Sequence, residues 1–207
     1  RDRPDRDRFS AYVGSFFGMS TPAFRRRDTI PDVAKFFHVS ALVRHPRNAE
    51  GLASILEHFF RVPVRIQQYV GHWMPLGPRE RTYLGREGAV LGRGAEARPF
   101  VCDRQHKFRV RLGPLTLRLY ESFLPARTGH RAPLDRLVDW VRLYGCLELE
   151  WDVRLRLAAS EVPRLKLGSA GRLGWTTWLG TRPADRDADD LCLHAETFAT
   201  PPGVVAA

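Results

Sequence analysis

Residues 147–157 read LELEWDVRLRL, eleven positions at which apolar and charged residues alternate without interruption. Side chains of a β-strand point to opposite faces in turn, so this period of two predicts a strand with one face in the core. The other face carries Glu148 and Glu150, followed by Arg154 and Arg156. Charge pairing along a strand surface explains these carboxylates, and no catalytic acid pair is inferred from them.

Three further segments have periodicities that predict regular structure around this strand. Residues 133–144 carry apolar residues at helical spacing and are followed by Gly145, which predicts a helix that ends there. Residues 108–120 alternate again, and Gly113-Pro114 is expected to divide them into two strands. Residues 64–73 predict one more strand, which runs towards Trp73.

The N-terminal part of the chain predicts helices. Apolar positions at helical spacing indicate helices over residues 9–18, 31–43 and 48–60, with Asn48 as the N-cap of the last. Because a short loop joins the second and third helices, they are expected to form a helical hairpin. Helices followed by a β-rich region with one interposed helix, without a regular βαβ repeat, predict an α+β fold.

The composition is that of a folded domain. The chain has 207 residues, of which 43% are hydrophobic and 11% aromatic, too many for a disordered protein. No stretch approaches the roughly 20 apolar residues that a membrane span needs, so no direct membrane insertion is expected. The three cysteines, Cys102, Cys146 and Cys192, are odd in number and far apart, which predicts reduced thiols in a cytoplasmic protein.

Basic residues exceed acidic ones, and nearly all of them are arginine. The formal net charge is +10, and Lys35, Lys107 and Lys166 are the only lysines among the 33 basic residues. A positive charge of this size is consistent with a nucleic-acid-binding module that neutralises phosphates. Arginine also forms bidentate pairs with carboxylates at protein interfaces, and an arginine-rich genome would give the same composition with no function attached.

Motifs for catalysis, cofactors and metals are incomplete. Residues 92–97, GRGAEA, fit the dinucleotide-binding pattern, but Pro99 interrupts the helix that would hold the pyrophosphate. Acidic residues between positions 185 and 196 follow the spacing of a calcium loop, but Asp190 stands where its sharp turn requires glycine. The histidines show no metal-ligand pairing on a helical face. The sequence therefore predicts no catalytic, cofactor-binding or metal-binding residues and no enzyme activity.

Residues 173–180, LGWTTWLG, place two tryptophans three positions apart between glycines. One interpretation is a bent strand with both rings in the core. The other is a loop that presents both rings to a partner protein, because tryptophan contributes much of the binding energy at interfaces. Trp175 and Trp178, together with Leu124 and Pro125, are the predicted protein-binding residues.

An ordered set of segments resembles the TssG (ImpH) family of the bacterial type VI secretion system. The resemblance extends over residues 9–198, and the order of the segments is more specific than any one of them. The segments are NAEGL at 48–52, RVPV at 61–64, Tyr69-Val70, Trp73, Leu84-Gly85, Leu91-Gly92, KFR at 107–109, LGPL at 112–115, FLP at 123–125, residues 137–144, WDVRL at 151–155, LGW at 173–175 and Trp178-Leu179.

This resemblance implies a structural, non-enzymatic role without cofactors. A TssG-like subunit joins TssF-like subunits in a wedge and binds TssK-like trimers. With further baseplate components, these wedges form a cytoplasmic platform at the membrane-docked secretion apparatus of bacteria. Members of the family are longer, so the chain is expected to be a fragment. Residues 126–128 also differ from the glycines that often follow the FLP triplet in the family.

The chain is expected to divide into a helical segment over residues 1–61, a β-rich partner-binding region over residues 62–200 and a frayed tail over residues 201–207. The arginines that alternate with core residues in 108–120 and 147–157 are expected to lie on one outward face. That face suits fixed contacts with acidic partner surfaces better than contacts with phosphates, so nucleic acid is not expected among the partners. A basic nucleic-acid-binding module is the alternative function.

Overall fold

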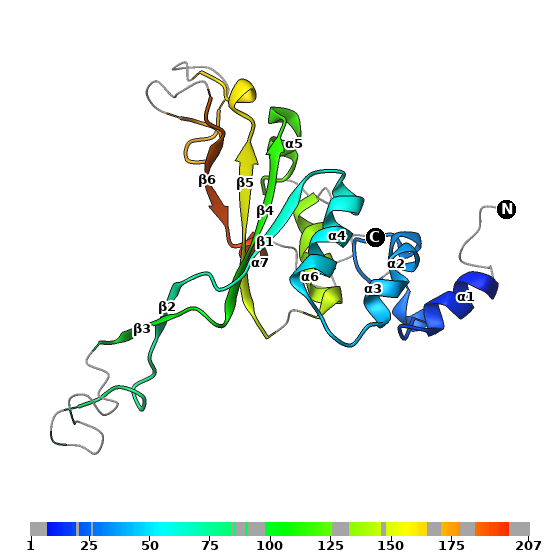
Figure 1. Cartoon of the computed structure of the whole chain (residues 1–207), viewed down its shortest axis with the longest axis horizontal. Coiled ribbons are helices and arrows are strands. Elements are labelled where there is room, and N and C mark those ends of the chain that lie inside the picture. Colours follow the sequence, from blue (N-terminus) through cyan, green and yellow to red (C-terminus); the bar gives the residue numbers. More distant parts are fainter. Residues whose placement is uncertain are drawn as a thin grey trace.

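The structure of the chain is a computed structural model that describes residues 8–19, 21–25, 27–83, 85, 90, 98–125, 133–145, 148–164, 171–178 and 185–198. Within these residues, helices precede a mixed four-stranded sheet, and a separate two-stranded ribbon extends from the lower end of the sheet in Figure 1. Helices and strands do not alternate regularly along the chain, which confirms the predicted α+β class.

The four-stranded sheet has the order β1-β4-β5-β6, formed by β1 (Val64–Gln67), β4 (Lys107–Leu115), β5 (Glu150–Leu157) and β6 (Ala188–Leu193). β4 and β5 run parallel, whereas β1 and β6 pair antiparallel with them at the two edges. The strand predicted over residues 147–157 is confirmed as β5, which begins at Glu150; Leu147 lies outside the described residues. Its buried apolar residues are those that the alternation predicted: Trp151, Val153, Leu155 and Leu157.

Two helices connect β4 to β5 and allow these strands to run parallel. The first, α5 (Leu117–Ser122), replaces the second strand predicted within residues 108–120, and the next, α6 (Pro133–Tyr144), has its predicted bounds. The strand prediction is wrong because β4 continues through Gly113-Pro114, where its register with β5 shifts. The apolar residues that follow β4 fit a helical spacing as well as an alternating one.

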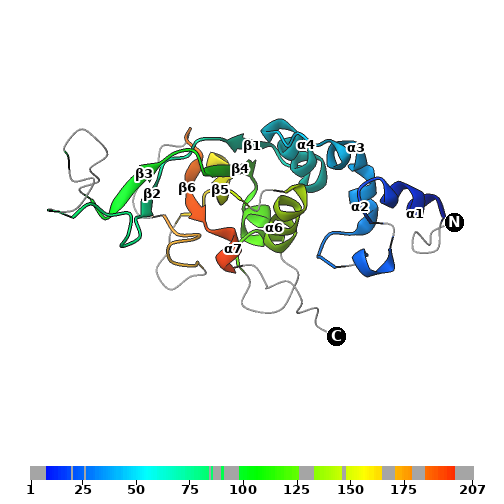
Figure 2. The same cartoon turned by 90° about the horizontal axis from the view of Figure 1, so that it is seen from below.

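Helices α4 (Ala49–Phe60) and α6 lie beside one another on one side of the sheet (Figure 2). Asn48 caps α4 as predicted, because its side-chain oxygen accepts a hydrogen bond from the Gly51 N–H at 2.9 Å. The Tyr144 hydroxyl of α6 donates to the Asn48 carbonyl at 3.2 Å, which joins the two helices at this end. Buried core residues of these helices and of the sheet include Leu52, Ile55, Leu56, Val110, Leu112, Leu134, Leu137, Val138, Trp140 and Val141.

The segment before α4 contains α1 (Arg8–Ser15), the 3₁₀ helix η1 (Pro22–Phe24), α2 (Asp32–Phe37) and α3 (Val39–Val43). The single helix predicted over residues 31–43 is wrong, because His38 separates α2 from α3. The predicted helical hairpin is not confirmed. Two apolar side chains of α2 are exposed, Val33 by 56% and Phe37 by 67%.

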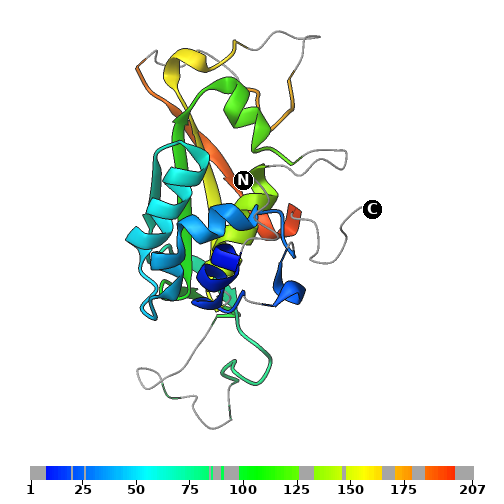
Figure 3. The same cartoon turned by 90° about the vertical axis from the view of Figure 1, so that its right-hand side faces the viewer.

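Polar contacts attach this N-terminal segment to α6. The N–H and the hydroxyl of Thr29 both donate to Asp139 Oδ2, each at 2.7 Å. Lys35 is buried and pairs with Asp28 at 2.7 Å and with Asp32 at 3.0 Å. Burial raises the pKa of Asp28, although the neighbouring Lys35 opposes that effect. In Figure 3 these blue helices lie in front, on the helical side of the sheet.

The two-stranded ribbon, called the arm below, consists of β2 (His72–Pro75) and β3 (Phe100–Asp103), which pair antiparallel. It extends away from the four-stranded sheet (Figures 1 and 2). The single strand predicted over residues 64–73 is therefore wrong in its second half. β1 ends at Gln67, and the backbone turns at Tyr69, which has a φ of 57°.

Two short elements complete the described chain, the 3₁₀ helix η2 (Ala159–Glu161) after β5 and α7 (Ala195–Phe198) after β6. The division of the chain at residue 61 stays a prediction. The dinucleotide-like residues 92–97 and the tail 201–207 lie outside the described residues.

Candidate partner-binding surfaces

The structure brings the predicted protein-binding residues together around α5. Residues 171–178 form a turn, called the tryptophan turn below, in which the Trp175 N–H donates to the Arg172 carbonyl at 3.0 Å. The buried Tyr120 hydroxyl of α5 donates to the Trp175 carbonyl at 2.9 Å. The Arg172 guanidinium donates to the Pro125 carbonyl at 3.1 Å. These two hydrogen bonds attach the tryptophan turn to α5 and to Pro125 of the FLP triplet.

Both indole rings are half-buried and pack against the core. The Arg172 guanidinium lies 3.7 Å from the centroid of the Trp175 ring. The Trp178 Nε1–H donates to Asp190 at 3.2 Å. The bent-strand interpretation is wrong about the strand, because residues 173–176 form a turn, but both rings do pack against the core as it expected. Binding of a partner by Trp175 and Trp178 stays a prediction.

Exposure separates the residues of this cluster into supporting and presented groups. Leu124 is 3% exposed and belongs to the core, so it supports the surface from beneath. Leu173 is 87% exposed at the tryptophan turn and was not among the predicted binding residues. Its position in the LGW segment, one of those that resemble the TssG family, could have identified it as a candidate. Burial and the charge of Asp190 raise the pKa of Tyr120 to about 12, so its hydroxyl stays a donor at neutral pH.

The arm carries a second apolar surface that sequence reasoning missed. Trp73 is 61% exposed and Phe100 is 49% exposed. In the antiparallel register, Trp73 is opposite Cys102 and Phe100 is opposite Pro75, so the two aromatic rings lie on the same face of the ribbon. At the base of the arm, Tyr69 is 69% exposed. Exposed aromatic residues grouped on a projecting element are typical of protein-binding surfaces.

A histidine connects the arm with the four-stranded sheet. His72 of β2 has Nδ1 at 3.7 Å from Asp103 Oδ2 of β3 and Nε2 at 3.5 Å from Glu150 Oε2 of β5. His106, between the arm and β4, lies 3.1 Å from the same Asp103 oxygen. These contacts connect the base of the arm with β5 and with the loop before β4.

A third apolar surface lies on the N-terminal segment, at the opposite end of the molecule from the arm (Figure 1). Its exposed large side chains come from α1, η1, α2 and α3 and from the turn after α1. They are Tyr12, Phe16, Phe24, Val33, Phe37 and Val43.

The sheet face opposite the helices carries charged side chains. Arg109 donates to both carboxylate oxygens of Asp152, and Lys107 lies 3.2 Å from the same carboxylate. Burial raises the pKa of Asp152, but the hydrogen bonds and charges of Arg109 and Lys107 outweigh it and hold that pKa below its ordinary value. This carboxylate is therefore ionised in the folded protein.

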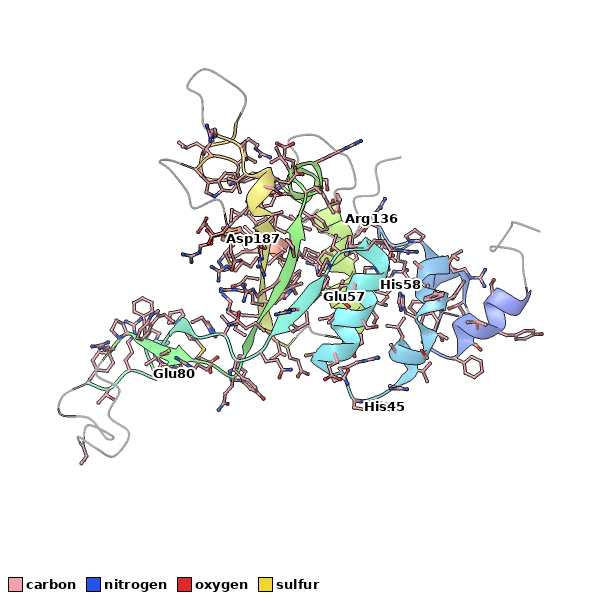
Figure 4. All side chains as sticks on the ribbon, turned by 45° about the horizontal axis from the view of Figure 1, so that its top comes forward. His45, Glu57, His58, Glu80, Arg136 and Asp187 are labelled. Carbon is pink, nitrogen blue, oxygen red and sulfur yellow. The ribbon has the colours of Figure 1, made fainter. Side chains whose placement is uncertain are left out.

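Acidic residues of the predicted calcium-loop pattern belong to this ionic network. Asp189 of β6 lies 2.6 Å from Arg111 Nη2 and 3.1 Å from Arg154 Nε. Asp187, labelled in Figure 4, lies 2.7 Å from Arg156 Nε. Both carboxylates therefore pair with arginines of the sheet. Of the arginines expected on one outward face, Arg109, Arg111, Arg154 and Arg156 lie on this face of the sheet, and each pairs with a carboxylate of the same chain.

An open pocket of about 440 Å³ lies between the first turn of α4 and the base of the arm, lined in part by Leu52, Tyr69 and Tyr144. Arg47, also in its wall, lies over the Tyr144 ring at 5.1 Å and donates to two backbone carbonyls of α3. Among the described residues, no three His, Cys, Asp or Glu side chains are arranged to hold a metal ion. No helix in the described part of the chain is long and apolar enough to span a membrane.

Comparisons with known proteins point to one family. A family model described as "Type VI secretion, TssG" matches residues 1–180. A solved structure of the type VI secretion TssK-TssF-TssG baseplate subcomplex, obtained by cryo-electron microscopy, contains a chain with the same fold. The TM-score is 0.65 at 18% sequence identity, over 88% of this chain and 77% of that chain. No curated protein matches the sequence.

Proposed function

Because the chain belongs to the TssG family of type VI secretion, which matches residues 1–180, we propose that it is a structural component of a secretion baseplate. In this role it joins TssF-type and TssK-type subunits, the proteins that accompany the structurally similar chain in its subcomplex. Its contribution is assembly and not catalysis. It acts in the bacterial cytoplasm, at the membrane-docked secretion apparatus.

The main observation in support of this proposal is that the exposed apolar surfaces are separated on the molecule. Trp73 and Phe100 lie on the arm, whereas the N-terminal surface with Phe16 and Phe37 lies at the other end of the molecule (Figures 1 and 2). A subunit that joins different partners needs separate surfaces, because one surface can hold only one partner at a time. Large exposed apolar groups of this kind mark protein interfaces.

The tryptophan turn supplies a further surface for the same role. Leu173 is presented to solvent, and Trp175 and Trp178 lie half-buried beside it with Pro125 close by. Aromatic and arginine side chains in partly buried positions contribute most to binding. We therefore retain Trp175, Trp178 and Pro125 as partner-binding residues, with Leu124 as their support in the core. Residues 62–200 form a β-rich partner-binding region in this proposal, and the helical segment of residues 1–61 adds the N-terminal apolar surface.

Co-expression with TssF-type and TssK-type subunits of the same bacterium tests this function. The chain should co-purify with both, and light scattering after size exclusion should give a mass that contains all three proteins. Elution of the chain on its own, with folding confirmed by circular dichroism, would contradict the proposed function.

A further inference from the structure

Three arginines lie side by side on the sheet face opposite the helices. Arg65 of β1 is directly opposite Arg111 of β4, and Arg111 is directly opposite Arg154 of β5. Neighbouring strands are about 4.8 Å apart, so this arginine row crosses about 10 Å of the sheet. Like charges at directly opposed positions destabilise a sheet. Asp189 pairs with both Arg111 and Arg154, so the remaining opposed like charges in the row are Arg65 and Arg111.

The described part of the chain offsets only part of this positive charge. Asp189 lies 2.6 Å from Arg111 Nη2 and 3.1 Å from Arg154 Nε. Arg65 is exposed, and it forms no ion pair with any residue that the structure describes. One carboxylate among three guanidinium groups leaves a positive surplus in the row.

The two inner arginines are held in place before any ligand binds. Arg154 also donates from Nε to the Asp189 backbone carbonyl at 2.8 Å. The Arg111 and Arg154 side chains nevertheless remain 37% and 31% exposed. A guanidinium group carries five N–H donors in a planar fork, so these contacts leave donors for a ligand. An ordered site loses less conformational entropy on binding than a flexible one.

We propose that the row of Arg65, Arg111 and Arg154 binds an acidic segment of a partner protein, whose carboxylates pair with the guanidinium groups across the strands. The inference rests on the proposed function, because it assigns one surface and one partner chemistry to the same assembly role. Charge complementarity supports this inference, because the row has a surplus of positive charge and a guanidinium group can pair with a carboxylate through two hydrogen bonds.

Carboxylates on the same face favour a protein over a nucleic acid as the partner. Asp152, Asp187 and Asp189 lie among the arginines and interrupt the positive potential along the strands. A nucleic-acid backbone requires a continuous basic strip, because its phosphates are evenly spaced. A protein segment places a few carboxylates at fixed points, which suits a short row.

Fluorescence anisotropy with the full chain tests the proposal with two probes, a glutamate-rich peptide and a single-stranded RNA of equal charge. The informative variant is Arg65→Glu, because Arg65 is exposed and its loss breaks no ion pair with a described residue. Arg44→Glu is the matched control, since Arg44 is exposed after α3 and the change in net charge is identical. Arg65→Glu should weaken peptide binding by about tenfold or more, and Arg44→Glu should leave it unchanged. Higher salt should weaken the wild-type interaction.

In the anisotropy assay, three results would overturn the proposal: no peptide binding by the wild-type chain, equal losses in both variants, or tighter binding of the RNA through Arg65. The last result would identify a nucleic-acid site instead. The assembly assay separates this proposal from the proposed function. If Arg65→Glu joins TssF-type and TssK-type subunits with wild-type affinity, the proposed function stands. The arginine row is then not the site that binds an acidic segment of a partner. If the wild-type chain does not join them, the proposed function itself fails.

Discussion

Arg109 and Asp152 occupy directly opposed positions on the parallel strands β4 and β5, and the guanidinium of Arg109 donates to both oxygens of the Asp152 carboxylate. The Asp152 side chain is 1% exposed, and Lys107 at 3.2 Å provides a second cation. Bidentate arginine–carboxylate pairs have a defined geometry, so this contact favours one register between the two central strands.

Replacement of Asp152 by asparagine should destabilise the protein by about 3 kcal/mol, because it leaves the partly buried Arg109 and Lys107 without their anion. The pKa of Asp152 is lowered in the folded state, so its stabilising effect is present above the unfolded pKa of about 4 and is lost as the pH falls through the folded pKa. Urea unfolding between pH 7 and pH 3 would measure both effects. Glu148→Gln, at an exposed position, is the control. If the unfolding free energy of Asp152→Asn falls between pH 7 and pH 3 as steeply as that of the wild type, this assignment is wrong.

His38 should make the unfolding free energy depend on pH near neutrality. Burial and the nearby His58, whose ring centroid lies 5.1 Å away, lower the pKa of His38. The unfolded chain binds this proton more readily, so stability should fall as the pH drops below about 6.5. His38→Gln should flatten the stability profile between pH 7 and pH 5, measured by thermal unfolding. His45→Gln, in the exposed loop before α4 (Figure 4), should retain the wild-type slope.

Tyr120→Phe should loosen the tryptophan turn. The substitution removes the hydroxyl that donates to the Trp175 carbonyl at 2.9 Å, with an expected cost of about 1 kcal/mol. Iodide should then quench tryptophan fluorescence more strongly than in the wild type. Tyr12→Phe, at a position that is 67% exposed, controls for loss of a hydroxyl alone. Equal quenching in all three proteins would show that α5 does not hold the turn.

Trp73→Ala combined with Phe100→Ala should weaken the complex with the partner subunits by about thirtyfold, as expected for an aromatic hot spot. Both side chains are largely exposed, so the unfolding free energy should change little. Met74→Ala is the matched control, because Met74 lies on the opposite face of the same ribbon. Biolayer interferometry with immobilised partner subunits would measure the difference. Equal affinities of the double variant and the control would exclude the aromatic face of the arm from binding.

Long, unbroken periodicities predicted their elements well. The bounds of α6, the Asn48 cap of α4 and the core face of β5 each depend on residues within one helix or strand. Residues 115–120 were predicted as a strand because these six residues fit both periods, but α5 begins within them at Leu117. The outcome depended on how β4 pairs with β5, two segments that α5 and α6 separate in the chain.

The candidate surfaces were predicted less completely. Trp175 and Trp178 could be selected from their spacing and from the resemblance to the TssG family. Trp73 and Phe100 could not be paired from the sequence, because their common face exists only in the antiparallel register of β2 and β3. Leu173 was overlooked because an exposed leucine and a buried leucine have the same local pattern.

Alternation along residues 147–157 was enough to assign alternate side chains to opposite faces, because side-chain direction in a strand depends on the local backbone alone. It could not reveal which charges meet on the outer face. Arg65, Arg111 and Arg154 come from three separate strands, and the pairing register places them in one row with Asp189 from a fourth. Register arises from hydrogen bonds and packing between segments far apart in the chain, so the charge pattern of this face is a property of the assembled sheet.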